Sequence, residues 1–267
     1  MDAITLSIFQ NALIGGFIVG ALASYLGVFV VQRRMAFLGS GLSHAAFGGA
    51  ALGMLLNTQP LWAAVPFTVL VGLAIVWVRE HSRLESDTTI GIFFSVSMAL
   101  GVVFLSLKRG YAADATTYLF GSILAVNRED VIVAGLVAAI VFALGPLWSR
   151  WAYATFDRNL ARADRLPVMR DDYILTICLA VAIVVSMKLV GIVLISAFLV
   201  LPPATARLAA RTFAGMTLWS VALGVSSVAG GLFLSATLDL PSGAVIILLQ
   251  AALFFAMLTW HRLVGAQ

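Results

Sequence analysis

Long apolar segments alternate with short polar ones from one end of the chain to the other. Apolar windows of roughly 20 residues, enough to cross about 30 Å of hydrocarbon, are typical of membrane-spanning helices. The pattern predicts such spans at residues 8–31, 37–56, 61–78, 88–107, 131–148, 173–187, 189–206, 213–236 and 243–260. We therefore expect an all-α polytopic integral membrane protein with a single transmembrane domain, residues 1–267, and about nine transmembrane helices, or eight if one weak segment only dips into the bilayer.

Two segments depart from this pattern. Within residues 111–127 the apolar run YLFGSILAV is only nine residues long, too short for a crossing, so we expect an interfacial or re-entrant helix there. Residues 149–172 form the longest polar segment, and Asp157 can cap a short helix inside it. A helix tied to spans on both sides can dock in a groove on another protein, or it can be an ordinary basic loop that lies on the membrane.

The composition excludes a soluble domain, because hydrophobic residues make up 62% and charged residues only 10% of the 267 positions. Of the 16 Lys and Arg residues, 12 lie in one set of loops, at 32–36, 79–87, 149–172 and 207–212 and in the C-terminal tail. Cytoplasmic loops carry the excess of positive charge, so we expect the N-terminus outside and the C-terminus in the cytoplasm. The positive charge orients the protein in the lipid bilayer and predicts no nucleic-acid partner.

His44 is the ionisable side chain inside the span at 37–56, in the stretch RRMAFLGSGLSHAAFGGAALG. An imidazole in hydrocarbon loses hydration, so it needs a partner, a water-filled path or a metal ion. The small residues around it let helices approach closely and leave room for a conduit. Both a transport path and a packing histidine bonded to a backbone carbonyl fit this pattern.

The chain lacks the motifs with which a transporter would supply its own energy. Neither lysine follows a glycine, so there is no phosphate loop ending in Gly-Lys-Ser/Thr. The acidic residues lie almost wholly at span ends, which argues against a buried proton relay. We therefore expect a protein that is not an enzyme and whose energy comes from a partner. The single cysteine, Cys178, excludes an intramolecular disulfide and a thiolate metal cage.

Several blocks in the same order resemble the permease subunits of the ABC importers for zinc, manganese and iron. They are RRMAFLGSGLSHAAFGGAALG, DTTIGIFFSVSMALGVVFLSL, DATTYLFGSILAV, FDRNLARADRLPV, SMKLVGIVLISAFLVLPPATARL and LDLPSGAVIILL. The resemblance implies a fold similar to that of the cobalamin-type importers and a homodimeric channel in the cell inner membrane. It also implies two copies of an ABC ATPase subunit and an extracytoplasmic metal-binding protein as partners. It further implies that no cofactor is permanently bound and that the transported ion is Zn²⁺ or Mn²⁺, with Fe²⁺ as a third candidate.

The resemblance also assigns roles to single residues. The family's coupling-helix pattern is matched by Phe156, Asp157, Leu160 and Ala161. The family often has Glu where Asn159 stands and Gly where Arg165 stands. His44 matches the histidine of a Ser-His-Ala motif that faces the translocation path, whereas Ser40 and Ser122 replace frequent acids.

A weak relay of metal ligands is the chemistry that these residues predict. A hydrated divalent cation needs oxygen or imidazole ligands as it sheds water, yet it must not be held so tightly that it stays. The predicted path residues are His44, Ser40, Ser43 and Asp114. Pro202 and Pro203 are predicted to break the seventh span, either as a gate hinge or as the end of the span.

Three other functions remain compatible with the sequence. The first is a self-contained secondary transporter, metal or proton coupled, with His44 as the relay. The second is a permease of the same fold for a metal chelate, which calls for a wide, aromatic-lined cavity. The third is a membrane scaffold without a conduit, in which His44 would be dispensable.

Overall fold

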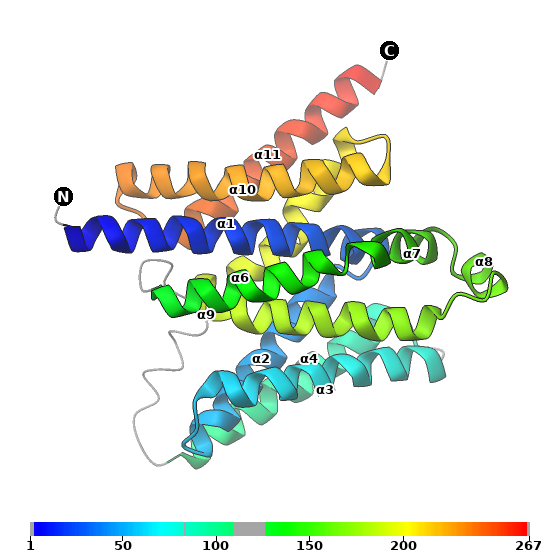
Figure 1. Cartoon of the computed structure of the whole chain (residues 1–267), viewed down its shortest axis with the longest axis horizontal. Helices are drawn as coiled ribbons and strands as arrows, with labels where there is room; N and C mark the ends of the chain where they lie inside the picture. Colours follow the sequence, from blue (N-terminus) through cyan, green and yellow to red (C-terminus); the bar gives the residue numbers. More distant parts are fainter. Residues whose placement is uncertain (1–2, 83, 109–125, 266–267) are drawn as a thin grey trace.

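The computed structural model describes residues 3–82, 84–108 and 126–265, and all regular structure in this part of the chain is helical (Figure 1). The all-α prediction is thus confirmed for these residues. The helices are α1 (Ala3–Gln32), α2 (Phe37–Leu55), α3 (Pro60–His81), α4 (Ser86–Leu107), α6 (Arg128–Ala143), α7 (Gly145–Phe156), α8 (Arg158–Ala163), α9 (Val168–Ala209), α10 (Phe213–Leu238) and α11 (Ser242–Gly265).

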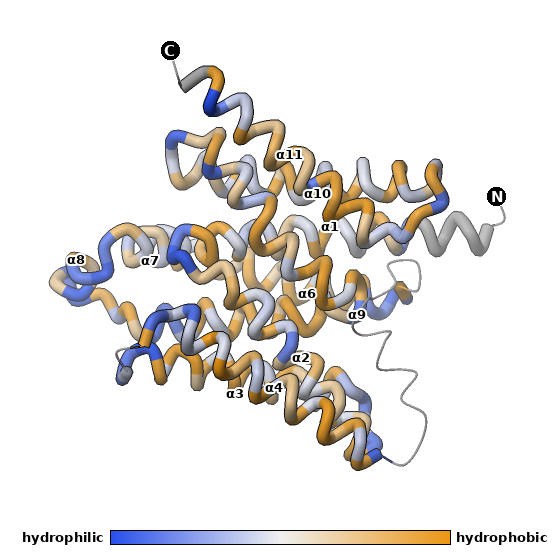
Figure 2. The backbone as a smooth tube through the Cα atoms, turned by 180° about the vertical axis from the view of Figure 1, so that it is seen from behind, coloured by the Kyte–Doolittle hydropathy of each residue, from blue (hydrophilic) through white to orange (hydrophobic). Residues whose placement is uncertain are grey.

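Helices α1 and α9 form the centre of the bundle. Most of their residues are buried, whereas few residues of α4 and α11 are buried. In Figure 1, α2, α3 and α4 lie on one side of this centre, and α10 and α11 lie on the other. Figure 2 shows that hydrophobic residues dominate the helices and that hydrophilic ones gather around α8 and at helix ends. Exposed apolar surface on the outer helices is what contact with lipid requires.

Six of the described helices are long and apolar enough to cross a membrane, and the bent pair of α6 and α7 makes a seventh. This count lies below the eight or nine crossings that the sequence predicts. One reason is that two predicted spans, 173–187 and 189–206, belong to the single 42-residue helix α9. A kink at Gly191 divides α9 into two halves, which at 1.5 Å per residue are about 35 Å and about 27 Å long, each close to the thickness of the hydrocarbon.

The bend in α9 lies at Gly191, whose φ of 80° and ψ of 164° are non-helical. The sequence predicts the break at Lys188, but Lys188 continues the helix and its Nζ lies 2.6 Å from Asp130 Oδ1 of α6. A glycine has no Cβ and therefore adopts this backbone conformation without a steric penalty. The predicted break at Pro202 and Pro203 is not found, because α9 continues through both residues to Ala209.

The predicted span at 131–148 is shorter in the structure. Helix α6 ends at Ala143, and α7 begins at Gly145 after a bend of 65°. Pro146 explains the new start, because proline fits the first turn of a helix and cannot continue a preceding one. The bend directs α7 towards α8 at one end of the bundle (Figure 1).

Candidate functional site

His44 lies on α2 and is only partly buried in the single chain. Its Nδ1 lies 2.9 Å from the Ser40 carbonyl oxygen, and its ring centroid is 4.4 Å from that of Phe94 on α4. A carbonyl oxygen only accepts, so Nδ1 carries the proton and donates. In the neutral ring Nε2 then holds the lone pair that a metal ion binds.

The two predicted serines lie in different surroundings. Ser40 is half-buried one turn before His44, on the same side of α2. Ser43 is fully buried; its hydroxyl donates to the Gly39 carbonyl over 2.7 Å and lies 3.3 Å from Ser196 Oγ on α9. The structure therefore brings Ser40 to His44 and places Ser43 in the contact between α2 and α9.

The other predicted ligand, Asp114, and the replaced acid position Ser122 lie outside the described residues, as does nearly all of the predicted re-entrant segment 111–127. Within the residues that the structure describes, no group of three or more His, Cys, Asp or Glu side chains could hold a metal ion together. The described residues of the predicted path offer one imidazole, that of His44, with hydroxyl and carbonyl oxygens near it. That these donors make brief contacts with a cation stays a prediction.

Close backbone contacts fix the position of α2. A Cβ added at Gly48 would lie 2.7 Å from the Ser97 carbonyl oxygen of α4, and one at Gly49 would lie 2.7 Å from Cα of Ala64 on α3. Real side chains do not approach backbone atoms so closely, so these positions require glycine. The glycines after His44 thus hold α2 tightly between α3 and α4.

The second candidate site is the short helix α8, which follows α7 at one end of the bundle (Figure 1). Asp157 is its N-cap, and the Asp157 carboxylate accepts from the backbone amides of Asn159 at 3.0 Å and Leu160 at 2.9 Å. The cap satisfies two amides that the helix itself leaves unpaired. The predicted cap at Asp157 is therefore present.

The remaining residues of the coupling pattern divide into two kinds. Ala161 is fully buried against Ala154 and Val168, so it anchors α8. Leu160 is 49% exposed and Phe156, the last residue of α7, is 67% exposed. These two apolar side chains present a surface beyond the bundle that another protein can cover.

Arg165 ends this segment in a left-handed conformation, with φ of 59°. The Arg165 amide donates to the Arg162 carbonyl, and the Leu166 amide donates to the Ala161 carbonyl over 3.0 Å. This pair of hydrogen bonds is a Schellman motif, which favours glycine at the position that Arg165 occupies. The geometry explains why the resembled family often has Gly there.

Ion pairs join α8 to α3 and α9, another joins the end of α1 to α9, and the sequence does not predict them. Arg158 pairs with Glu80 of α3 and lies 2.7 Å from Asp172 of α9; Arg162 also lies 2.8 Å from Glu80. Arg33 at the end of α1 pairs with Asp172 over 2.5 Å. The sequence shows only that acids and arginines gather at the ends of the predicted spans. It does not indicate which acid pairs with which arginine across the bundle.

Two further contacts hold the same region. Arg150 of α7 donates to both carboxylate oxygens of Asp171 over 2.9 Å. Tyr153 donates to Asp164 over 2.5 Å. Both contacts tie α7 to the segment that follows it.

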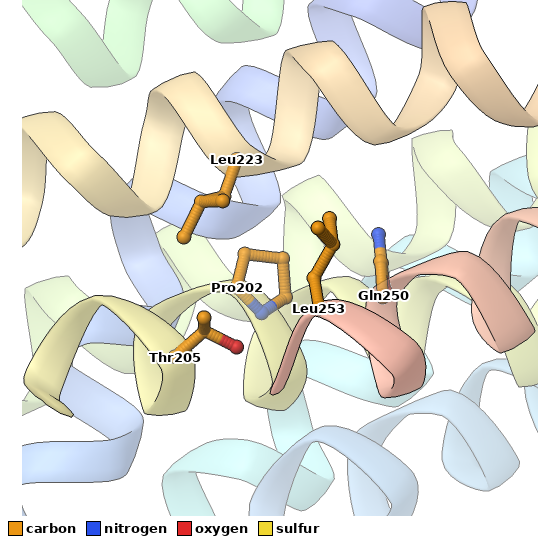
Figure 3. A pocket seen from close by; sticks show the side chains of 5 residues that line it. All are labelled: Pro202, Thr205, Leu223, Gln250 and Leu253. Atoms are coloured by element: carbon orange, nitrogen blue, oxygen red, sulfur yellow. The ribbon is translucent and has the colours of Figure 1, made fainter. Parts of the chain in front are cut away.

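Pro202 lines a narrow crevice between α9, α10 and α11 together with Thr205, Leu223, Gln250 and Leu253 (Figure 3). Gln250 is buried and its Nε2 donates to Ser227 Oγ over 2.9 Å. The crevice has no room for a water molecule. Pro202 thus lies in a dry helix contact, and the role of Pro202 and Pro203 as a hinge stays a prediction.

Comparison with known proteins places these features in a wider context. The ABC 3 transport family matches residues 5–261 of the chain. The high-affinity zinc uptake system membrane protein ZnuB of Haemophilus influenzae is 37% identical over 244 residues, which cover 91% of this chain and 94% of that protein. The manganese transport system membrane protein MntC of Halalkalibacterium halodurans is 34% identical over 249 residues, which cover 93% of this chain and 85% of that protein.

A solved structure is similar over most of the molecule. A chain of PsaBC from Streptococcus pneumoniae in complex with Fab superposes with a TM-score of 0.82 at 33% sequence identity, covering 94% of this chain and 90% of that chain.

Proposed function

Because the chain belongs to the ABC 3 transport family, we propose that it is the membrane-spanning permease subunit of an ATP-binding cassette importer for a divalent transition metal ion. The relatives named for zinc uptake and for manganese transport support this class of cargo. The proposal assigns ATP hydrolysis to a separate ATPase subunit present in two copies, and metal delivery to an extracytoplasmic binding protein.

The geometry of α8 carries this proposal. A six-residue helix capped by Asp157 is held away from the spans, exposes Leu160, and is fixed by ion pairs to α3 and α9. An exposed apolar contact on a rigidly attached helix suits the transmission of motion from an ATPase to transmembrane helices. A solitary secondary carrier has no need of such a surface.

A second copy of the chain completes the path in this proposal. His44 and Ser40 are only half-buried in the single chain, and few residues of α4 beside them are buried. Polar groups that guide a hydrated ion cannot face lipid, so another protein surface must cover them. A homodimer supplies that surface and places two copies of His44 along one conduit.

The proposed membrane arrangement has nine crossings: α1 to α4, α6 continued by α7, the two halves of α9, α10 and α11. The length of α9, its bend at Gly191 and the position of α2 between neighbouring spans support this count. With α8 in the cytoplasm the N-terminus lies outside and the C-terminus inside, as the distribution of Lys and Arg indicates.

The donor set leaves the identity of the cargo to experiment. Zn²⁺ and Mn²⁺ both accept imidazole, and Mn²⁺ favours oxygen. His44 Nε2, the Ser40 hydroxyl and Asp114 would form successive weak contacts for either ion, and Fe²⁺ is a third candidate. Weak contacts at each step suit a conduit, because a tightly held ion would not leave.

Metal uptake by cells without their own high-affinity importers tests the proposal. The chain is supplied with its ATPase and binding protein, and native protein is compared with His44→Ala and with His81→Ala as the matched control. We expect uptake to require all three proteins and to fall about tenfold or more in His44→Ala only. Uptake by this chain alone would favour a secondary carrier, and normal uptake by His44→Ala would remove His44 from the path.

A further inference from the structure

A cavity of about 160 Å³ lies where α8 meets the ends of the long helices. Among the described residues its lining contains three arginines, Arg33, Arg79 and Arg158, and one acid, Asp172. Its volume is several times the space that one water molecule needs. The metal path does not use this cavity, because a cluster of guanidinium groups repels a cation.

The arginines have more hydrogen-bonding capacity than their neighbours satisfy. Arg33 donates from Nε to Thr155 and from Nη1 to Asp172. Only 11% of the side chain is exposed, and its Nη2 is buried without a hydrogen-bond partner. Arg158 pairs with Glu80 and Asp172, and its Nε is buried and unpartnered. Buried donors of this kind are normally satisfied by water or by a ligand.

Arg79 adds a charge that the described acids do not balance. None of the ion pairs among the described residues involves Arg79, and it lines the cavity from the last turns of α3. Asp172 is already shared between Arg33 and Arg158, and Glu80 between Arg158 and Arg162. The cavity therefore has an excess of positive charge and planar donors that match an oxyanion.

We propose that this cavity binds a phosphate-class oxyanion, which bridges Arg33, Arg79 and Arg158 and so links α1, α3 and α8. Guanidinium groups recognise phosphate oxygens through paired N–H donors. The chemistry is shared by the headgroup of an anionic phospholipid and by free phosphate. The cavity lies at the end of membrane-spanning helices, where headgroups lie. The bound anion would stiffen the junction between the coupling helix and the spans.

Binding to the full-length protein, purified in neutral detergent and stripped of lipid, tests this proposal. Native mass spectrometry measures retention of phosphatidylglycerol with phosphatidylcholine as the zwitterionic reference, and a thermal unfolding series measures protection by inorganic phosphate. The variants are Arg79→Gln, which removes one donor group, and Asp172→Asn, which removes the competing internal anion. Arg170→Gln, an exposed arginine in the first turn of α9, is the matched control.

We expect affinity for phosphate-bearing ligand to fall about tenfold in Arg79→Gln, to rise in Asp172→Asn and to stay unchanged in Arg170→Gln. A rise in Asp172→Asn distinguishes a binding site from a merely structural cluster, which that change would only weaken. Selective retention of phosphatidylglycerol identifies a lipid site, and protection by inorganic phosphate alone identifies a site for the free ion. Equal binding by native protein and Arg79→Gln, or no binding of either ligand by native protein, would overturn the proposal.

Discussion

Arg158 Nη2, in the first residue of α8, lies 2.7 Å from Asp172 Oδ2 in α9. The same guanidinium pairs with Glu80 of α3, so one side chain connects α8 to two long helices. The Asp172 side chain is only 4% exposed, and a charge pair so little exposed to water is screened less than a surface pair. In the proposed importer we therefore expect a displacement of α8 by a docked partner to move α3 and α9 with it.

Replacing Glu80 by Gln removes the carboxylate that Arg158 and Arg162 share. We expect Glu80→Gln to assemble with the ATPase but to transport several-fold fewer ions per ATP hydrolysed, a coupling loss of about 1 kcal/mol. Parallel assays of uptake and ATP hydrolysis in proteoliposomes measure this ratio. Glu85→Gln, at the exposed N-cap of α4, is the matched control. An unchanged ratio in Glu80→Gln would show that the ion pairs do not transmit motion.

Replacing Leu160 by Asp places a charge in the centre of the proposed docking surface. A carboxylate buried against an apolar groove loses its hydration without a partner, so we expect ATPase binding to weaken at least about tenfold. Co-purification with the ATPase measures the effect, and the amount of Leu160→Asp in the membrane should equal that of native protein. Leu263→Asp, an equally drastic change at an exposed leucine of α11, should bind the ATPase normally. Normal assembly of Leu160→Asp would refute the docking role of α8.

The sequence predicts part of this region and not the rest, for a physical reason. The Asp157 cap depends on residues two and three positions away, so the local sequence contains it. The pairs of Glu80 with Arg158 and of Arg33 with Asp172 join residues 78 and 139 positions apart. Only the packing of α1, α3 and α9 brings them together, and no local pattern encodes that packing.

The same distinction applies to α9. The predicted break at Lys188 rests on the cost of a charge inside an apolar segment, but Asp130 of α6 neutralises that charge. The break at Pro202 and Pro203 rests on lost backbone hydrogen bonds, and α9 tolerates that loss in a packed environment. The bend lies instead at Gly191, which looks ordinary in the sequence. For His44 the sequence predicts a backbone carbonyl as one possible partner, and the structure identifies it as that of Ser40, four residues earlier. The half-buried state of His44 follows from packing.

Labelling of introduced cysteines tests the proposed orientation. Asn57 and Leu84 are exposed at opposite ends of α3, and the native Cys178 is buried. We expect a membrane-impermeant maleimide to label Asn57→Cys in intact cells and Leu84→Cys only after permeabilisation. The unmodified protein, with Cys178 alone, serves as the blank. Labelling in the reverse order would invert the topology and would place α8 outside.

Replacing Arg165 by Gly relieves the left-handed backbone at the end of α8. A residue with a Cβ costs about 1 kcal/mol of folding free energy in this left-handed conformation. Glycine avoids this cost, but part of the gain is offset because glycine loses more conformational entropy on folding. We expect Arg165→Gly to slow hydrogen exchange at the Leu166 amide about two- to fivefold, measured by mass spectrometry of the segment. Arg165→Ala removes the same charge but keeps the Cβ, so it should show no slowing. Equal slowing in both variants would attribute the effect to charge.

Replacing Gly27 by Ala tests how closely α1 and α9 must approach. A Cβ at Gly27 would lie 2.4 Å from the Leu199 carbonyl oxygen, a backbone atom that cannot turn away. The two central helices would have to separate, which costs about 1–3 kcal/mol of folding free energy. We expect Gly27→Ala to lower the thermal unfolding midpoint in detergent. Gly135→Ala in α6 meets only the tip of the Ile18 side chain at 3.8 Å, so it should leave the midpoint unchanged or raise it through better helix propensity. If both variants unfold at the native midpoint, the contact between α1 and α9 adapts to an added methyl group, and the small residues of this chain do not set the helix spacing.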